Sequence, residues 1–244
     1  MPEAQGGLGL PPAVRACLFD LDGVLTRTAG LHAAAWKQMF DEFLRARAQA
    51  NGAPFVPFDA VRDYVRYVDG KLRIDGARSF LAARGITPPE ATVVALAERK
   101  DEILIALMRE RGVETYPGSV RYVRAAREAG LRTAVVSSSK HCQQALESAG
   151  IAALFDARID GNVAAAAHLA GKPAPDTYLA AARALGVEPA SAVVFEDALS
   201  GVEAGRAGHF GFVVGVDRAG QAAELRRHGA DVVVADLAAL LEAA

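Results

Sequence analysis

From Gly118 onward, short apolar runs rich in β-branched residues alternate with stretches of helical periodicity, and this alternation restricts the possible folds most. The expected strands are Arg132–Val136, Ala157–Ile159, Ala192–Phe195, Gly211–Val216 and Asp231–Val234. The expected helices are Gly118–Ala129, Lys140–Ala149, Pro175–Leu185, Ala198–Ala207 and Ala219–Arg227. Strict alternation of this kind is typical of parallel βαβ units. The sequence therefore predicts an α/β fold with a doubly wound parallel sheet.

One further apolar run, Val14–Phe19, predicts a buried strand that a long helical stretch separates from the others. The expected helices of that stretch are Leu31–Phe43, Ala60–Tyr67, Asp75–Arg84 and a long one ending near Arg111, which Thr87-Pro88-Pro89-Glu90 would open as a capping box. Arg45–Asp59 contains Gly52, Pro54 and Pro57 and predicts a loop. We therefore expect an α/β core of residues 13–29 and 113–244, a helical cap domain at 30–112 and a loose tail at 1–12.

Composition excludes several classes of protein. The net charge of −2 is spread over balanced acidic and basic residues, so the chain has no strong attraction for nucleic acid or an anionic membrane. No apolar run approaches the roughly 18 residues of a membrane span, and the first residues lack the pattern of a signal peptide. Two cysteines cannot form a disulfide framework. We expect a cytoplasmic, monomeric protein.

Polar side chains follow four of the predicted core segments. In open α/β sheets, ligands bind beyond the carboxyl ends of the strands, so these residues should meet at one edge. They are Asp20 and Asp22, Ser137 and Ser138, Lys172, and Glu196 with Asp197. Each cluster alone has a simpler explanation, because Asp-Gly turns are common, serines and acids cap helices, and a lysine is usually a surface charge. Their conjunction favours a functional site.

The residue types suit phosphoryl transfer. Crowded carboxylates need a cation, and ligands that are all oxygen favour Mg²⁺, which often binds carboxylates together with substrate phosphate. Asp20 could attack phosphorus and form an aspartyl phosphate. Asp22, two residues further on, could act as the general acid and base. A serine hydroxyl and the Lys172 ammonium could hold the phosphoryl oxygens.

The segment Phe19-Asp20-Leu21-Asp22-Gly23-Val24-Leu25-Thr26 resembles the DxDGx[VT] signature of the haloacid dehalogenase superfamily. Ser137 is similar to the serine or threonine of its second motif, Lys172 to the lysine of its third, and Glu196-Asp197 to its acidic fourth motif. The resemblance covers nearly the whole chain from Val14. It implies that Asp20 is the nucleophile, that Asp22 is the acid/base and binds Mg²⁺ through its backbone carbonyl, and that Asp20, Glu196 and Asp197 are further ligands.

Within the superfamily the chain is most similar to the β-phosphoglucomutase-like family. Beyond the core motifs, this resemblance rests on His32 with Trp36, on Gly70-Lys71-Leu72-Arg73 and on Arg99-Lys100. It implies that Gly70 and Arg73 form a cap loop that grips a distal phosphate, that Lys100 contacts the sugar phosphate, and that His32 lies near the acid/base. His141, just after the serine cluster, is a further candidate for substrate binding. The implied activity interconverts β-D-glucose 1-phosphate and glucose 6-phosphate through β-glucose 1,6-bisphosphate.

Other functions remain open from the sequence. A sugar-phosphate phosphatase would use the same residues, with water as the acceptor. A haloacid dehalogenase would not need Asp22, and a phosphonoacetaldehyde hydrolase would need a cap lysine, for which Lys71 and Lys100 are available. The intact carboxylates argue against a catalytically silent binding module. The chain also departs from the family, with Arg27 where many relatives carry aspartate and Leu72 in place of a small polar residue.

Overall fold

The computed structural model describes residues 7–242, in which six parallel strands form one sheet in the order β3-β2-β1-β4-β5-β6. The strands are β1 (Ala16–Asp20), β2 (Arg132–Val136), β3 (Ala157–Ile159), β4 (Ala192–Glu196), β5 (Phe212–Val216) and β6 (Val232–Val234). β1 lies at the centre, between β2 and β4, and is buried along its whole length. The predicted doubly wound α/β fold is confirmed.

Helices cover both faces of the sheet and create two apolar layers. On one face, Tyr122 of α4 (Pro117–Glu128) packs against Phe19 and Phe195, and α5 (Cys142–Ser148) and α10 (Ala238–Glu242) contribute to the same apolar cluster. On the other, α7 (Asp176–Leu185) and α8 (Leu199–Ala207) pack against Leu18 and Val194, and α9 (Ala222–His228) packs beside α8. The shorter helices of the core are α6 (Gly161–Ala166), η2 (Ala152–Leu154) and η3 (Pro189–Ser191). Because both faces of the sheet are covered, its central strands are continuous apolar runs, which explains why their positions could be predicted.

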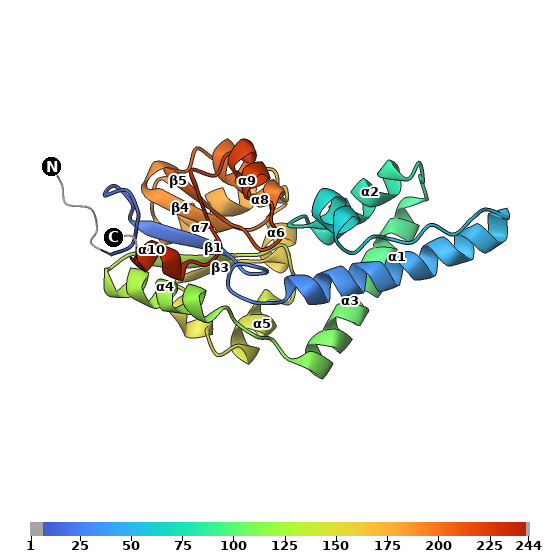
Figure 1. Cartoon of the computed structure of the whole chain (residues 1–244), viewed down its shortest axis with the longest axis horizontal. Helices are drawn as coiled ribbons and strands as arrows, with labels where there is room; N and C mark the ends of the chain where they lie inside the picture. The colour runs from blue at the N-terminus through green and yellow to red at the C-terminus, as the bar shows by residue number, and fades with distance from the viewer. Residues whose placement is uncertain (1–6, 243–244) are drawn as a thin grey trace.

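The helices of residues 30–112, here called the cap, lie beside the sheet and extend away from it (Figure 1). They are α1 (Ala29–Asn51), η1 (Tyr64–Val68), α2 (Arg73–Ala83) and α3 (Glu90–Arg111). Within the cap, the ring of Phe40 packs on those of Trp36, Phe58 and Phe80 with centroids 4.2–5.3 Å apart, and these rings belong to the same apolar cluster as Phe19 and Phe195 of the sheet. That the cap is a separate domain with boundaries near 30 and 112 stays a prediction.

Two backbone segments connect the cap to the core, and they are hydrogen-bonded to each other. The backbone N–H of Arg27 donates to the carbonyl of Glu114, and that of Tyr116 donates to the carbonyl of Leu25. Thr26 and Thr115 form an antiparallel bridge between these bonds. The chain therefore enters and leaves the cap at one place, next to the end of β1.

Several local predictions were wrong. The expected loop Arg45–Asp59 begins later, because α1 continues through the good helix formers Arg45–Ala50 and ends where Gly52 adopts a left-handed conformation. The expected helix 60–67 is largely the π-helix η1, whose carbonyl at Tyr64 accepts from the N–H of Asp69. The Thr87 capping box does not form, since α3 begins after Pro89 without a side-chain cap. Helix α10 was not predicted.

The structure describes only part of the expected loose tail of residues 1–12, because residues 1–6 lie outside the described part of the chain. Within the described part, Leu8 and Leu10 are buried, and the hydroxyl of Tyr122 on α4 donates to the carbonyl of Leu8 at 2.8 Å. The segment Leu8–Leu10 is therefore packed against the core. Two leucines separated by the single residue Gly9 form too short an apolar pattern to indicate burial from the sequence. Across residues 7–242, no helix is long and apolar enough to cross a membrane.

Candidate active site

The loop after β1 folds back sharply and brings Asp20 and Asp22 to the sheet edge. The N–H of Gly23 donates to the carbonyl of Thr26, and the N–H groups of Leu25 and Thr26 donate to the carbonyl of Leu21. Gly23 has φ +90°, and a Cβ there would lie 1.7 Å from Oδ2 of Asp197. Glycine is therefore required both by the backbone conformation and by the close approach of the fourth motif.

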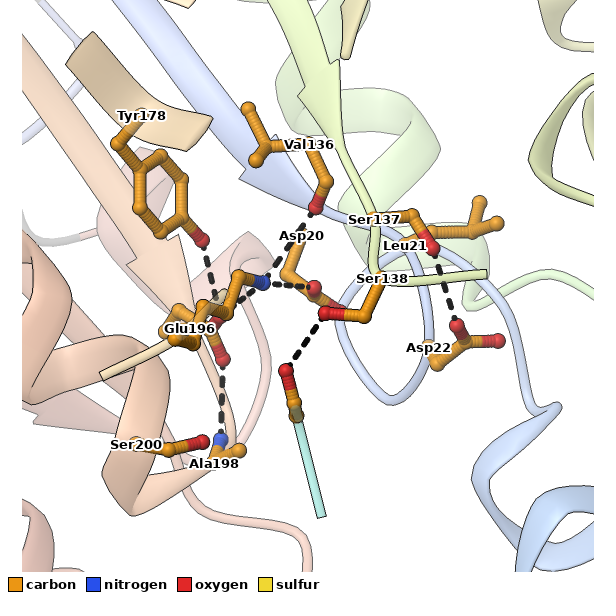
Figure 2. Close-up of polar contacts among 12 residues, drawn as sticks. Asp20, Leu21, Asp22, Val136, Ser137, Ser138, Tyr178, Glu196, Ala198 and Ser200 are labelled. Carbon is orange, nitrogen blue, oxygen red and sulfur yellow. Dashed lines mark hydrogen bonds and ion pairs between the residues drawn. The ribbon is translucent and has the colours of Figure 1, made fainter. Parts of the chain in front are cut away.

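Lys172 is buried between two carboxylates. Its Nζ lies 2.5 Å from Oδ1 of Asp20 and 2.5 Å from Oε1 of Glu196. Figure 2 shows Asp20 and Glu196 converging from neighbouring strands, with the hydroxyl of Tyr178 on α7 donating to the same Glu196 oxygen at 2.9 Å. Burial alone would lower the pKa of Lys172, but Asp20 and Glu196 raise it, so the ammonium stays charged. Lys172 thus neutralises part of the buried negative charge.

The single positive charge of Lys172 does not balance the negative charge of the carboxylates around it. Single oxygens of Asp20, Glu196 and Asp197 all lie within 4.8 Å of one another, and all three residues are buried. Burial raises the pKa of Asp20 well above its usual range, Lys172 opposes that rise, and Glu196 adds to it. The pKa of Asp197 is also raised well above its usual range, mainly by burial and then by the negative charges of Asp69 and Asp20. A set of oxygen donors with excess negative charge fits a hard divalent cation.

The side chain of Asp22 turns away from that cluster. Its Oδ1 accepts a short hydrogen bond from the hydroxyl of Thr28, and its Oδ2 lies 3.4 Å from the hydroxyl of Ser137. Nε2 of His32 lies 3.4 Å from Oδ1. Thr28 is the residue before α1, and its hydroxyl serves Asp22 instead of capping the helix. The carboxyl group of Asp22 therefore faces the cap, and metal binding through its backbone carbonyl stays a prediction.

His32 and Lys100 form a buried pair behind Asp22. Nζ of Lys100 lies 3.1 Å from Nδ1 of His32 and 5.3 Å from the ring centroid of Trp36. Burial, helped by Lys100, lowers the pKa of His32 to about 4, so the imidazole is neutral near pH 7. Burial also lowers the pKa of Lys100, to about 8. Because the ammonium can only donate, Nδ1 is the acceptor, and the Nε2–H of His32 is left to face Asp22.

The cap loop is fastened to the sheet edge by two serines. The hydroxyl of Ser138 donates to the carbonyl of Gly70 at 2.7 Å, and that of Ser200 on α8 donates to the carbonyl of Asp69 at 2.9 Å. Gly70 has φ +70°, and a Cβ there would lie 2.5 Å from the Ser200 hydroxyl oxygen. Gly70 thus allows the loop to approach the core closely. Ser138 therefore contacts the cap, and its predicted role in binding phosphate stays a prediction.

Arg73 of the cap lines the same pocket as Asp20, and both Arg73 and His141 contact Asp101 at the pocket wall. Nη1 of Arg73, the first residue of α2, is 3.2 Å from Oδ2 of Asp101 on α3. Nε2 of His141, which precedes α5, is 3.1 Å from that same oxygen. One pocket between the cap and the sheet edge is lined by residues from both ends, among them Asp20, Asp22, Arg73, Lys100 and Asp197. The structure therefore brings nearly all the predicted residues to one place.

Sequence comparison supplies the family. A sequence profile of haloacid dehalogenase-like hydrolases matches residues 14–209. The chain belongs to this family. It is 55% identical to a protein of Mycobacterium bovis named beta-phosphoglucomutase, with 98% of this chain and 97% of that protein covered. It is 31% identical to a Bacillus subtilis protein of the same name, covering 91% and 89%. A Clostridium difficile beta-phosphoglucomutase structure superposes with a TM-score of 0.74, at 25% identity and with 93% of each chain covered.

Membership of the haloacid dehalogenase-like family, with these relatives, makes the chain a phosphoryl-transfer enzyme, either a mutase or a phosphatase. The silent binding module is therefore excluded. The family also explains why the first strand, the serine cluster, the lysine and the acidic pair occur in this order along the chain. It does not choose between a sugar and water as the phosphoryl acceptor.

Several residues at the site were missed by sequence reasoning. Arg218 donates to the carbonyl of Gly23 at 2.8 Å, and Gln221 donates to that of Asp197 at 3.0 Å, so the loop after β5 supports both motifs. The rule used for the other strands, that polar residues after a strand face the site, would have found Arg218 had it been applied to Val216. Tyr178 and Thr28 gave no such signal, because a buried helix tyrosine is usually core and a threonine before a helix is usually a cap.

Proposed function

We propose that this enzyme is a β-phosphoglucomutase that interconverts β-D-glucose 1-phosphate and glucose 6-phosphate. The observation that carries the proposal is a single pocket lined by the carboxylates of Asp20, Asp22 and Asp197 from the core and by the guanidinium of Arg73 from the cap. A mutase must hold a sugar by both phosphorylated ends, and a pocket charged in this way suits that task. The relative from Mycobacterium bovis, 55% identical along nearly its whole length, carries the same name.

In this proposal Asp20 is the nucleophile. Its carboxylate oxygen attacks phosphorus at the end of β1, the bond between phosphorus and the sugar oxygen breaks, and an aspartyl phosphate forms. Lys172, already 2.5 Å from Asp20, is placed to balance charge on the transferring oxygens. The hydroxyl of Ser137 points to the same edge and could bind one of those oxygens.

Asp22 is the general acid and base. It gives a proton to the departing sugar oxygen and later takes one from the hydroxyl that attacks the aspartyl phosphate. Thr28 and the Nε2–H of His32 donate toward its carboxyl group and so fix its orientation. In a full cycle, phosphorylated Asp20 donates to the 6-hydroxyl of β-glucose 1-phosphate. The resulting bisphosphate turns over and returns its 1-phosphate to Asp20, which releases glucose 6-phosphate.

Asp20, Glu196 and Asp197, with the backbone carbonyl of Asp22, are the groups that would hold Mg²⁺. When bound, the ion would neutralise these carboxylates and the transferring phosphoryl group. Chelation should therefore lower turnover by about 10²-fold or more, and added Mg²⁺ should restore it. Calorimetric binding of Mg²⁺ to the apoprotein, weakened in Asp197→Asn, gives a readout independent of turnover. Full activity in excess chelator would contradict this assignment.

A sugar-phosphate phosphatase is the second candidate. The description of the matching family as hydrolases favours it, and the core residues would serve it equally well. The difference lies in the acceptor, since water replaces the sugar hydroxyl in attack on phosphorylated Asp20. In that case Arg73 and His141 would only select substrates, and no bisphosphate would be required.

One incubation separates the two functions. The enzyme is mixed with β-glucose 1-phosphate, Mg²⁺ and a trace of β-glucose 1,6-bisphosphate, and glucose 6-phosphate and free phosphate are measured together. A mutase produces glucose 6-phosphate well ahead of free phosphate and depends on the bisphosphate. Release of free phosphate at a rate equal to or above that of glucose 6-phosphate would replace the mutase with the phosphatase.

A further inference from the structure

Asp101 joins the cap and the core through a single carboxylate oxygen. Oδ2 lies 3.2 Å from Nη1 of Arg73 on α2 and 3.1 Å from Nε2 of His141, which precedes α5 of the core. The side chains of all three residues are about four-fifths buried, with exposed fractions of 19–20%. A contact so far removed from water is screened much less than a surface ion pair.

The carboxyl group of Asp101 is ionised in this setting. Burial opposes ionisation, but His141, Arg73 and Lys100 together hold the pKa of Asp101 below its usual range. Lys100 precedes it on α3, so two neighbouring residues of one helix serve different parts of the pocket. Lys100 faces His32, whereas Asp101 faces Arg73 and His141.

Arg73 keeps unused donors despite this contact. A guanidinium group carries five N–H donors, and the contact with Asp101 engages Nη1. Nε of Arg73 is buried and has no hydrogen-bond partner among the described residues. A buried donor without a partner is costly in a free protein, so its presence beside the pocket points to a ligand anion that satisfies it.

We propose that Asp101 is a positioning residue for the distal phosphate. It holds the guanidinium of Arg73 in one orientation at the pocket wall, where Nε2 of His141 of the core lies 3.1 Å from the same carboxylate oxygen, so the clamp is formed before substrate arrives. The inference rests on the proposed function, because a distal phosphate is what Arg73 would grip. Asp101 itself acts through Arg73. Fixing one long side chain in advance is worth about three- to tenfold in affinity.

Binding to a turnover-blocked enzyme tests this directly. In an Asp20→Asn background with Mg²⁺, calorimetry measures the dissociation constant of β-glucose 1,6-bisphosphate. Asp101→Asn, which keeps the shape of the side chain, should weaken binding by about three- to tenfold. In otherwise wild-type enzyme it should raise KM by that factor and change kcat little. The matched control is Glu102→Gln, which removes the same charge from the next residue of α3, a side chain that is 69% exposed and paired with Arg99. The control should bind like the parent.

A double-mutant cycle shows whether Asp101 acts through Arg73. Arg73→Ala with Asp101→Asn should bind no more weakly than Arg73→Ala alone. Independent, multiplying losses would overturn the proposal, as would tighter binding by Asp101→Asn, which would make Asp101 a competitor of the phosphate. If Asp101→Asn does not fold, Asp101→Glu retains the carboxylate and should lose less affinity than Arg73→Ala; an equal loss would overturn the proposal.

The cycle also distinguishes this inference from the proposed function. If Arg73→Ala weakens binding and Asp101→Asn does not, the positioning role is wrong and the mutase proposal stands. If the cycle shows coupling but the enzyme makes only free phosphate from β-glucose 1-phosphate, the mutase proposal falls and the role of Asp101 in holding a phosphate-binding arginine remains. If neither substitution changes affinity, Arg73 is no clamp, and the role of Asp101 falls with it.

Discussion

The core end of the pocket and the cap end are built by different means. At the core end, Asp20 and Glu196 are the last residues of buried strands and Asp197 follows the second of these, and the parallel sheet brings single oxygens of all three within 4.8 Å of one another. At the cap end, His32, Arg73 and Lys100 come from three helices that meet only because of how those helices pack. A sheet thus fixes the position of chemical groups through its backbone, whereas a helical insert does so through side-chain packing and ion pairs.

The largest expected effect breaks the core end. Asp20→Asn removes the nucleophile, and loss of a covalent nucleophile costs on the order of 10⁴-fold or more in kcat. Folding should persist, because the change is nearly isosteric. The measurement is turnover together with a thermal unfolding curve. The matched control is Asp160→Asn, an aspartate that follows edge strand β3 and caps α6. If a folded Asp20→Asn enzyme keeps more than a few per cent of activity, the covalent mechanism is wrong.

Asp22 lies where the two ends of the pocket meet. Its carboxyl group belongs to the loop after β1, whereas its partners Thr28 and His32 lie on the cap side, and Asp22→Ala removes this group. Turnover should fall by about 10²–10⁴, the usual value of general acid–base catalysis. Transfer from acetyl phosphate to Asp20 should suffer less, because that leaving group needs little protonation. Comparing the two donors checks the role. A smaller loss with the poorer leaving group would contradict it.

Arg73→Ala tests the cap end alone. Loss of a charge-assisted phosphate contact costs about 1.5–3 kcal/mol, or roughly ten- to over a hundredfold. Mutase turnover should fall by that factor, and hydrolysis of a small phosphate ester that does not reach the cap should fall much less. Arg78→Ala is the control, because Arg78 lies on the same helix, is half-exposed and pairs with Glu90. Equal losses for both substrates would argue for the phosphatase.

The smallest expected effect concerns stability. Lys100 is 4% exposed, and burial lowers its pKa to about 8. Lys100→Met removes the cost of burying the charge and should stabilise the fold by about 1–3 kcal/mol, while substrate binding weakens. The sign follows from the shift, because the unfolded chain holds this proton more tightly. The stabilisation should be full below pH 8 and vanish as pH rises toward about 10.5. Unfolding curves at pH 7 and 10 check this, and an unchanged or lower stability at pH 7 would contradict it.

The sequence predicted the α/β core more accurately than the helical cap. Strands β2 and β3 were predicted with their observed limits, since an apolar run between a helix and a turn has few alternatives. The ends of α1 and the nature of η1 were not, because helix propensity continues past Arg45 and a π-helix has no distinct pattern. Asp101 illustrates the limit best. It stands beside a predicted site residue, yet only the packing of α2, α3 and α5 shows that it joins Arg73 to His141.

The two hydrogen-bonded segments that connect the cap to the core have an evolutionary consequence. Because Thr26 and Thr115 lie side by side, about ninety intervening residues leave the sheet and return to it at a single point, so for the core they are equivalent to a short closed loop. An insert of another length or architecture can be exchanged at that point without changing strand order or the spacing of the carboxylates. New substrate ranges can thus arise by replacing one module while the reactive edge is inherited intact.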